Sequence, residues 1–129
     1  MDLKKQLDDP AFLETYFKVM NTYQWNNYAD YMENYGPSKH PDKAAEIQSL
    51  INFFHGIGVL LALDRIDIDL VGMQVGNRVV HIWNKMESVI AERRKLENMP
   101  YLWVYLEFMK DEQLKRESYP RGKASYLAH

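Results

Sequence analysis

The chain has 129 residues, of which 47% are hydrophobic and 26% charged, a composition that excludes a wholly disordered chain and suits one folded domain. Its 16 basic and 18 acidic residues give a formal net charge of -2, which argues against a dedicated nucleic-acid binder. No cysteine is present, so disulfides, thiolate metal sites and thiol chemistry are excluded.

The N-terminal third predicts two helices. Asp9 can accept the free N–H groups of a helix start, and Pro10 suits the first helical position. Apolar residues follow at spacings of three and four up to Tyr23, and Asn21-Thr22 predicts a break or bend. A second apolar stripe runs from Trp25 to Tyr35, and residues 36–41 form a loop rich in Gly and Pro.

The rest of the chain predicts three further helices. One runs from about 43 to 64, is capped by Asp42, and is apolar nearly all round in its second half, as expected of a helix surrounded by others. A long fourth helix, about 68–96, follows a cap at Asp67. Asn98-Met99-Pro100 ends it, and a fifth helix covers about 101–115.

These elements predict an all-α fold, a four- to five-helix antiparallel bundle with the 43–64 helix at its centre. We expect one helical domain over residues 1–116 and a mobile tail over 117–129. No segment reaches the roughly 18 uncharged apolar residues of a membrane span, and the N-terminus lacks the apolar core of a signal peptide. A cytoplasmic protein without membrane contact is therefore expected.

Four glycines lie inside predicted helices, where each costs about 1 kcal/mol relative to Ala. We expect close approach of the 43–64 and 68–96 helices to offset that cost. The alternative is a cleft for a ligand, which uses the same absence of side chains. The four positions are Gly56, Gly58, Gly72 and Gly76.

Polar residues interrupt the apolar pattern of the same two helices. Asn52 and His55 lie on one stripe, and Asn77 and His81 are four residues apart. The favoured interpretation is a hydrogen-bonded core network that sets the register of the helices. The alternative is a pocket for a small-molecule ligand, with the same four residues as its binding residues.

The sequence lacks the catalytic motifs that a helical or hydrolytic enzyme would need. No histidine has Glu three residues before it, and both His-Glu-x-x-His and Gly-x-Ser-x-Gly are missing from the sequence. We therefore expect no catalytic residue, no metal and no cofactor, and an enzyme is the less favoured class.

Three cations, Arg93, Arg94 and Lys95, end the fourth predicted helix. Cations at a helix C-terminus complement the helix dipole, and this is the favoured explanation. Contact with phosphate or nucleic acid is the weaker alternative.

Five of the nine tyrosines lie between Tyr16 and Tyr35. Tyr and Trp serve both in cores and in interfaces, and core packing and a contact surface are equally favoured here. The candidate interface residues are Trp25, Tyr28, Tyr31, Met32 and Tyr35.

Several packing motifs between residues 45 and 112 resemble a family of small helical proteins from bacteria and archaea, described as a domain of unknown function, DUF4760. The resemblance rests on Leu50-Ile51-Asn52-Phe53-Phe54 with Gly58, then Ile68, Leu70-Val71, Trp83, Ile90 with Arg94, and Leu106-Glu107-Phe108-Met109. It implies a helical fold and a prokaryotic, cytoplasmic setting. It implies no activity, cofactor or catalytic residue.

The leading hypothesis is a non-enzymatic interaction module that forms a homo-oligomer, or binds a protein partner, through its aromatic N-terminal helices. Binding of a small molecule at the polar stripe is the alternative, and contact with phosphate or nucleic acid comes third.

Overall fold

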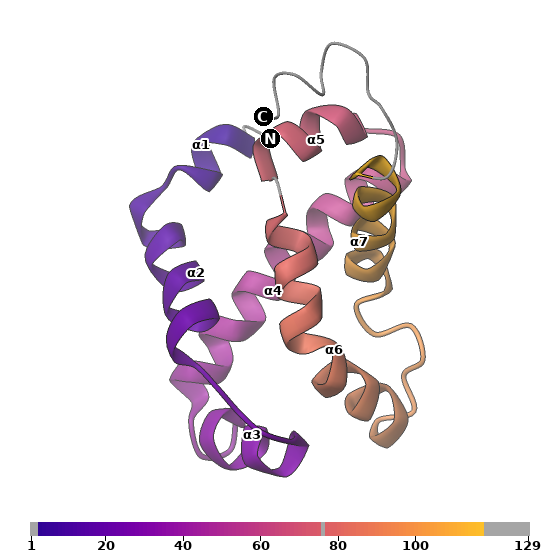
Figure 1. Cartoon of the computed structure of the whole chain (residues 1–129). Helices are drawn as coiled ribbons and strands as arrows, with labels where there is room; N and C mark the ends of the chain where they lie inside the picture. Colours follow the sequence, from indigo (N-terminus) through magenta and orange to yellow (C-terminus); the bar gives the residue numbers. More distant parts are fainter. Residues whose placement is uncertain (1–2, 76, 118–129) are drawn as a thin grey trace.

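The computed structural model describes residues 3–75 and 77–117. Within these ranges the chain forms seven helices and no strand, which confirms the all-α prediction and exceeds the four or five helices expected (Figure 1). The helices are α1 (Leu3–Leu7), α2 (Pro10–Thr22), α3 (Tyr28–Tyr35), α4 (Pro41–Ala62), α5 (Ile68–Val75), α6 (Arg78–Leu96) and α7 (Val104–Glu117).

The N-terminal helices begin at local capping signals. The Asp9 carboxylate accepts a hydrogen bond of 3.3 Å from the N–H of Phe12, and Pro10 is the first residue of α2, as predicted. The Asn27 side chain caps α3 in the same way, at 2.8 Å from the N–H of Asp30. The short α1 was not predicted, and its Leu3 and Leu7 are buried.

The central helix α4 starts two residues before the prediction. His40 occupies the capping position without a side-chain hydrogen bond, so the assignment of Asp42 as the cap is wrong. At the other end Asp64 adopts a left-handed conformation (φ 55°), and the N–H of Arg65 bonds to the carbonyl of Leu60 at 2.8 Å. This closure is a common way to end a helix, and it stops α4 at Ala62.

The prediction of one long helix over 68–96 is wrong, because α5 ends at Val75 and a separate helix, α6, begins at Arg78. Asn77 directly precedes α6, and asparagine is a weak helix former. Asp67 caps α5 as expected, bonding to the N–H of Asp69 at 2.8 Å. In Figure 1, α5 crosses the top of the molecule and α6 descends below it.

Helix α7 begins at Val104 and ends at Glu117, so it starts later and ends later along the chain than the predicted helix 101–115. Glu117, which was predicted to begin the tail, is the last residue of α7. The rest of the predicted tail, residues 118–129, lies outside the described part of the chain.

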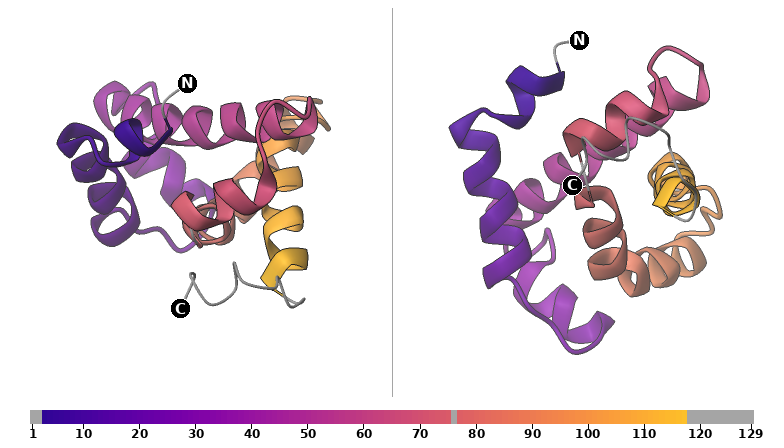
Figure 2. Two further views of the ribbon diagram at one scale, coloured as in Figure 1. Left: turned by 90° about the horizontal axis from the view of Figure 1, so that it is seen from above. Right: turned by 45° about the horizontal axis from the view of Figure 1, so that its top comes forward.

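The core is one cluster of buried residues that extends from Leu3 to Met109. Helix α4 makes its most extensive contact with α7 and also packs on α2 and α3. Both views of Figure 2 show α4 spanning the molecule, with α2 and α3 toward one side and α7 at the other. The middle of α4 supplies three of the most deeply buried side chains, Ile51, Phe54 and Ile57.

By length and composition alone, α4 would be able to cross a membrane, the one such helix among the described residues. Because α4 packs against α2, α3 and α7, its apolar residues contribute to the core of this fold. The central helix of a packed core can be as long and as apolar as a membrane-spanning helix, so length and composition do not distinguish the two.

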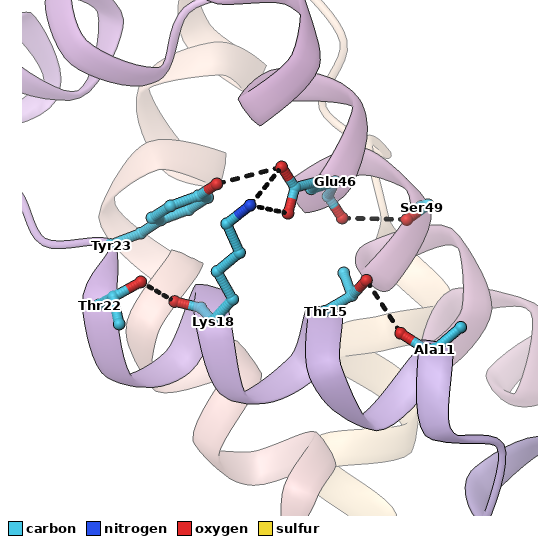
Figure 3. A network of polar contacts seen from close by, with 7 residues as sticks. All are labelled: Ala11, Thr15, Lys18, Thr22, Tyr23, Glu46 and Ser49. Carbon is cyan, nitrogen blue, oxygen red and sulfur yellow. Dashed lines mark hydrogen bonds and ion pairs between the residues drawn. The ribbon is translucent and has the colours of Figure 1, made fainter.

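A polar network joins α2 to α4 (Figure 3). The Tyr23 hydroxyl donates to Glu46 Oε1 at 3.1 Å, and the Lys18 ammonium lies 3.2 Å from Glu46 Oε2. Burial and the hydrogen bond to Glu46 both raise the pKa of Tyr23. The network therefore holds the aromatic end of α2 against the first turns of α4.

Of the four predicted packing glycines, Gly58 permits close approach of two helices. A Cβ atom there would lie 2.8 Å from the carbonyl carbon of Tyr105 and closer still to its oxygen. The neighbouring helix is thus α7, and not the 68–96 segment as predicted. Gly56 has open space around its Cβ position, Gly72 lies half-buried in α5, and Gly76 is outside the described residues.

We predict opposite effects for two neighbouring substitutions on α4. Gly58→Ala should lower the free energy of unfolding by about 1–3 kcal/mol, because the α7 backbone must move away. Gly56→Ala should raise it by about 0.5–1 kcal/mol, since alanine favours the helix and meets no neighbour. Urea unfolding followed by circular dichroism measures both, and equal effects would contradict the assignment.

Candidate interaction surface

The connection between α6 and α7 is held in place by Arg94. Its Nε donates to the carbonyl of Leu102 at 2.9 Å, and its Nη1 lies 2.9 Å from Glu107 Oε1. The guanidinium carbon is 5.8 Å from the centroid of the Trp83 ring. Arg94 of α6 thus ties the connection and α7 to its own helix.

Arg93 also contacts this connection, at Glu97 and at Trp103. Its Nε and Nη2 lie 2.7 and 3.4 Å from the two carboxylate oxygens of Glu97, and this interaction holds the pKa of Glu97 below its usual range. The guanidinium carbon also lies 4.8 Å from the centroid of the Trp103 ring. Both arginines therefore have partners within the chain, while Lys95 is exposed.

The backbone of the connection is sharply turned at two residues. Asn98 ends α6 with φ 52°, and the N–H of Met99 bonds to the carbonyl of Arg94 at 2.9 Å, so the predicted stop signal is confirmed. Trp103 has φ 53°, a conformation that costs a bulky residue about 1–3 kcal/mol. Burial of its ring beside Arg93 offsets that strain.

Four large apolar side chains on and beside this connection point into solvent. We call them the connection surface: Leu96, Met99, Tyr101 and Tyr105, exposed by 64%, 47%, 78% and 41%. They are half of the eight large apolar residues that the described part of the chain leaves exposed. Met99, Tyr101 and Tyr105 line one groove together, and Leu96 lies three residues before Met99. Grouped exposed apolar side chains mark interaction sites. The apolar pattern of the sequence did not predict that Tyr105 is exposed, because this residue lies at the spacing of a buried helical stripe.

A groove of about 640 Å³ opens beside the connection surface, between α4 and residues 99–105. Asn52 and His55 line it from α4, and Met99, Tyr101 and Tyr105 line it from the other side. None of its lining residues is Asp, Glu, Lys or Arg. The groove is therefore apolar and uncharged, with an imidazole and an amide as its side-chain polar groups besides the tyrosine hydroxyls and the Trp103 indole.

His55 is half-buried in this groove. Its ring lies edge-on to Tyr105, with the ring centroids 5.6 Å apart. Nδ1 is covered and has no hydrogen-bond partner within the described residues. Burial lowers the pKa of His55 below its ordinary value of 6.5, so the imidazole is neutral at pH 7.

The structure brings together only half of the predicted polar stripe. Asn52 is exposed and accepts a hydrogen bond of 3.0 Å from Gln48, and it shares the groove with His55. Asn77 and His81 are exposed on α6 and do not line the groove. The predicted core network is therefore wrong, because three of its four members face solvent.

The predicted interface residues lie largely inside the fold. Tyr31 and Tyr35 are 7% and 9% exposed, and Trp25, Tyr28 and Met32 are half-buried. Trp25 lies edge-on to Tyr31, with ring centroids 4.8 Å apart, and the Lys85 ammonium lies 5.0 Å from the Trp25 ring centroid. Their rings therefore pack mainly against one another.

A second groove of about 570 Å³ lies between α3, α4 and the end of α6. Tyr28, Tyr31 and Met32 line it together with Arg93 and Trp103. Trp103 thus lines both grooves. Among the described residues, no group of three His, Asp or Glu side chains is placed to hold a metal ion.

The chain belongs to the family described as Domain of unknown function (DUF4760), whose model matches residues 3–112. The match starts well before residue 45, where the sequence resemblance began. No curated protein and no solved structure matches the chain. Two residues that carried the resemblance, Arg94 and Glu107, form the ion pair that anchors the connection.

The first prediction at this site concerns Arg94. Arg94→Ala should lower the free energy of unfolding by about 1.5–3 kcal/mol, because it leaves Glu107 and the Leu102 carbonyl without their cationic partner. Lys95→Ala, at the exposed neighbouring position, should change it by less than about 0.5 kcal/mol. Urea unfolding compares the two, and a similar small effect at both positions would contradict the anchoring role.

The second prediction concerns the pH dependence of stability. Because folding lowers the pKa of His55, the unfolded chain binds a proton more readily, and stability falls as the pH drops below about 6.5. His55→Gln should lose less stability than the wild type between about pH 7.5 and about pH 5.5. Urea unfolding at the two pH values measures this, and equal losses would rule out a contribution from His55.

Proposed function

We propose that the chain is a non-enzymatic helical interaction module that self-associates through the connection surface. The observation that carries the proposal is the grouping of Met99, Tyr101 and Tyr105, all exposed, at one uncharged groove. Leu96, which is also exposed, lies three residues before Met99. Tyrosine and methionine are enriched in protein interfaces, and charged residues are depleted from the centres of interfaces. Removing these side chains from water supplies the driving force for association.

The contact surface in this proposal differs from the aromatic N-terminal helices favoured by the sequence. Tyr31 and Tyr35 already contact partners inside the chain, so a second copy would gain little by covering them. The connection surface is held rigidly by Arg93 and Arg94, which lowers the conformational entropy lost on binding. A cytoplasmic location and a prokaryotic source stay predictions.

Binding of a small apolar molecule in the His55 groove is the second candidate function. The groove volume of about 640 Å³ lies within the usual range of ligand sites, and its lining suits an uncharged molecule with one or two polar atoms. Contact with phosphate or nucleic acid comes last, because Arg93 and Arg94 are engaged with Glu97 and Glu107.

The test compares two pairs of leucine or methionine residues with matched exposure. Leu96→Asp with Met99→Asp places two charges on the connection surface, at side chains exposed by 64% and 47%. Leu63→Asp with Leu70→Asp is the control, at side chains exposed by 62% and 49% elsewhere. Sedimentation velocity over a wide concentration range measures the assembly state, and circular dichroism checks the fold.

We expect the wild type and the control to associate and the Leu96/Met99 variant to remain monomeric. A wild type that is monomeric at every concentration would contradict self-association. Equal association of both double variants would show that the contact surface lies elsewhere on the chain.

A further inference from the structure

We propose that two copies associate about a twofold axis with Tyr101 of each copy inserted into the His55 groove of the other. This inference rests on the proposed function and specifies its geometry: the partner is a second copy of this chain, which contributes Tyr101 to the site.

The first support is the adjacency of a protruding side chain and a groove on one surface. Tyr101 is 78% exposed, more than any other large apolar side chain among the described residues, and it is one of the residues that line the groove. A twofold contact requires that the same surface supply both complementary parts, since residue i meets residue j and j meets i. The connection surface and the groove meet that requirement.

The second support is the absence of charge from the lining. A twofold axis brings residues near it close to their own copies, so a charged patch there would face like charge and oppose association. The chain is 26% charged, yet the groove lining contains no Asp, Glu, Lys or Arg. Because His55 is half-buried and neutral at pH 7, the imidazole adds no charge either. These features favour a second copy over a charged partner.

The third support is the match between a phenol and the groove. A tyrosine side chain has an apolar ring and a hydroxyl tip, which suits a site that is apolar along its walls and polar at one place. The groove offers the ring of Tyr105 for contact, and the side chains of His55 and Asn52 for the hydroxyl. Imidazole and amide groups both provide hydrogen-bonding partners to a hydroxyl.

The experiment uses two variants of the full chain, each lacking one half of the contact. Tyr101→Ala removes the inserted side chain, which is also one of the lining residues, and leaves His55, Asn52 and Tyr105 in place to receive a tyrosine. Asn52→Trp fills the groove from an exposed position on α4 and leaves Tyr101 in place. Neither variant can make the contact with itself, but a mixture can form one of the two reciprocal contacts, with Tyr101 of the Asn52→Trp chain in the open groove of the other.

Each variant alone should self-associate at least about tenfold more weakly than the wild type, as expected when a central aromatic anchor is lost. The equimolar mixture should form a heterodimer more tightly than either homodimer, measured by sedimentation velocity with one chain fluorescently labelled. Circular dichroism confirms that both variants are folded.

Three results would overturn the inference, and they differ in what they say of the proposed function. If the wild type associates but the mixture is no better than either variant, reciprocal insertion is wrong and self-association stands. If the wild type is monomeric at all concentrations, both fail. If native mass spectrometry shows a monomer with a constant added mass that Asn52→Trp removes, the groove binds a small molecule instead.

Discussion

Gly58 of α4 lies against the backbone of Tyr105 of α7, and this close approach sets the distance between the two helices. It lets α4 and α7 form the most extensive helix contact in the fold. It also brings the Tyr105 ring beside His55, only three residues before Gly58. A side chain at position 58 would push the two helices apart and widen the groove, so packing and the candidate site depend on one missing Cβ atom.

Arg94 completes this arrangement from α6. By binding the Leu102 carbonyl and the Glu107 carboxylate, it holds the chain between α6 and α7 in a conformation that Trp103 adopts only at the expense of backbone strain. Since Leu102 and Glu107 flank the turn into α7, the position of Tyr101 and Tyr105 follows from that anchor.

The candidate site combines a rigid frame with apolar side chains that the fold leaves uncovered. Arg93, Arg94 and Trp103 fix the connection, whereas Leu96, Met99 and Tyr101 remain in solvent. A surface of this kind loses little entropy on binding and gains from removing apolar area from water. This balance is why the proposed function places association here and not on the aromatic residues of α3, whose rings are already packed.

Local signals in the sequence determined the helical class and several helix ends. Asp9-Pro10, Asp67 and Asn98 act through hydrogen bonds or backbone conformations within a few residues, so the sequence alone was enough to predict them. The break after Val75 could have been predicted from Gly76-Asn77, yet the apolar periodicity on both sides outweighed it. Which faces pair was decided only by the tertiary structure. The neighbours of Gly58, His55 and Arg94 lie on segments distant in the sequence or beyond a turn, and spacing along a single helix carries no information about such partners.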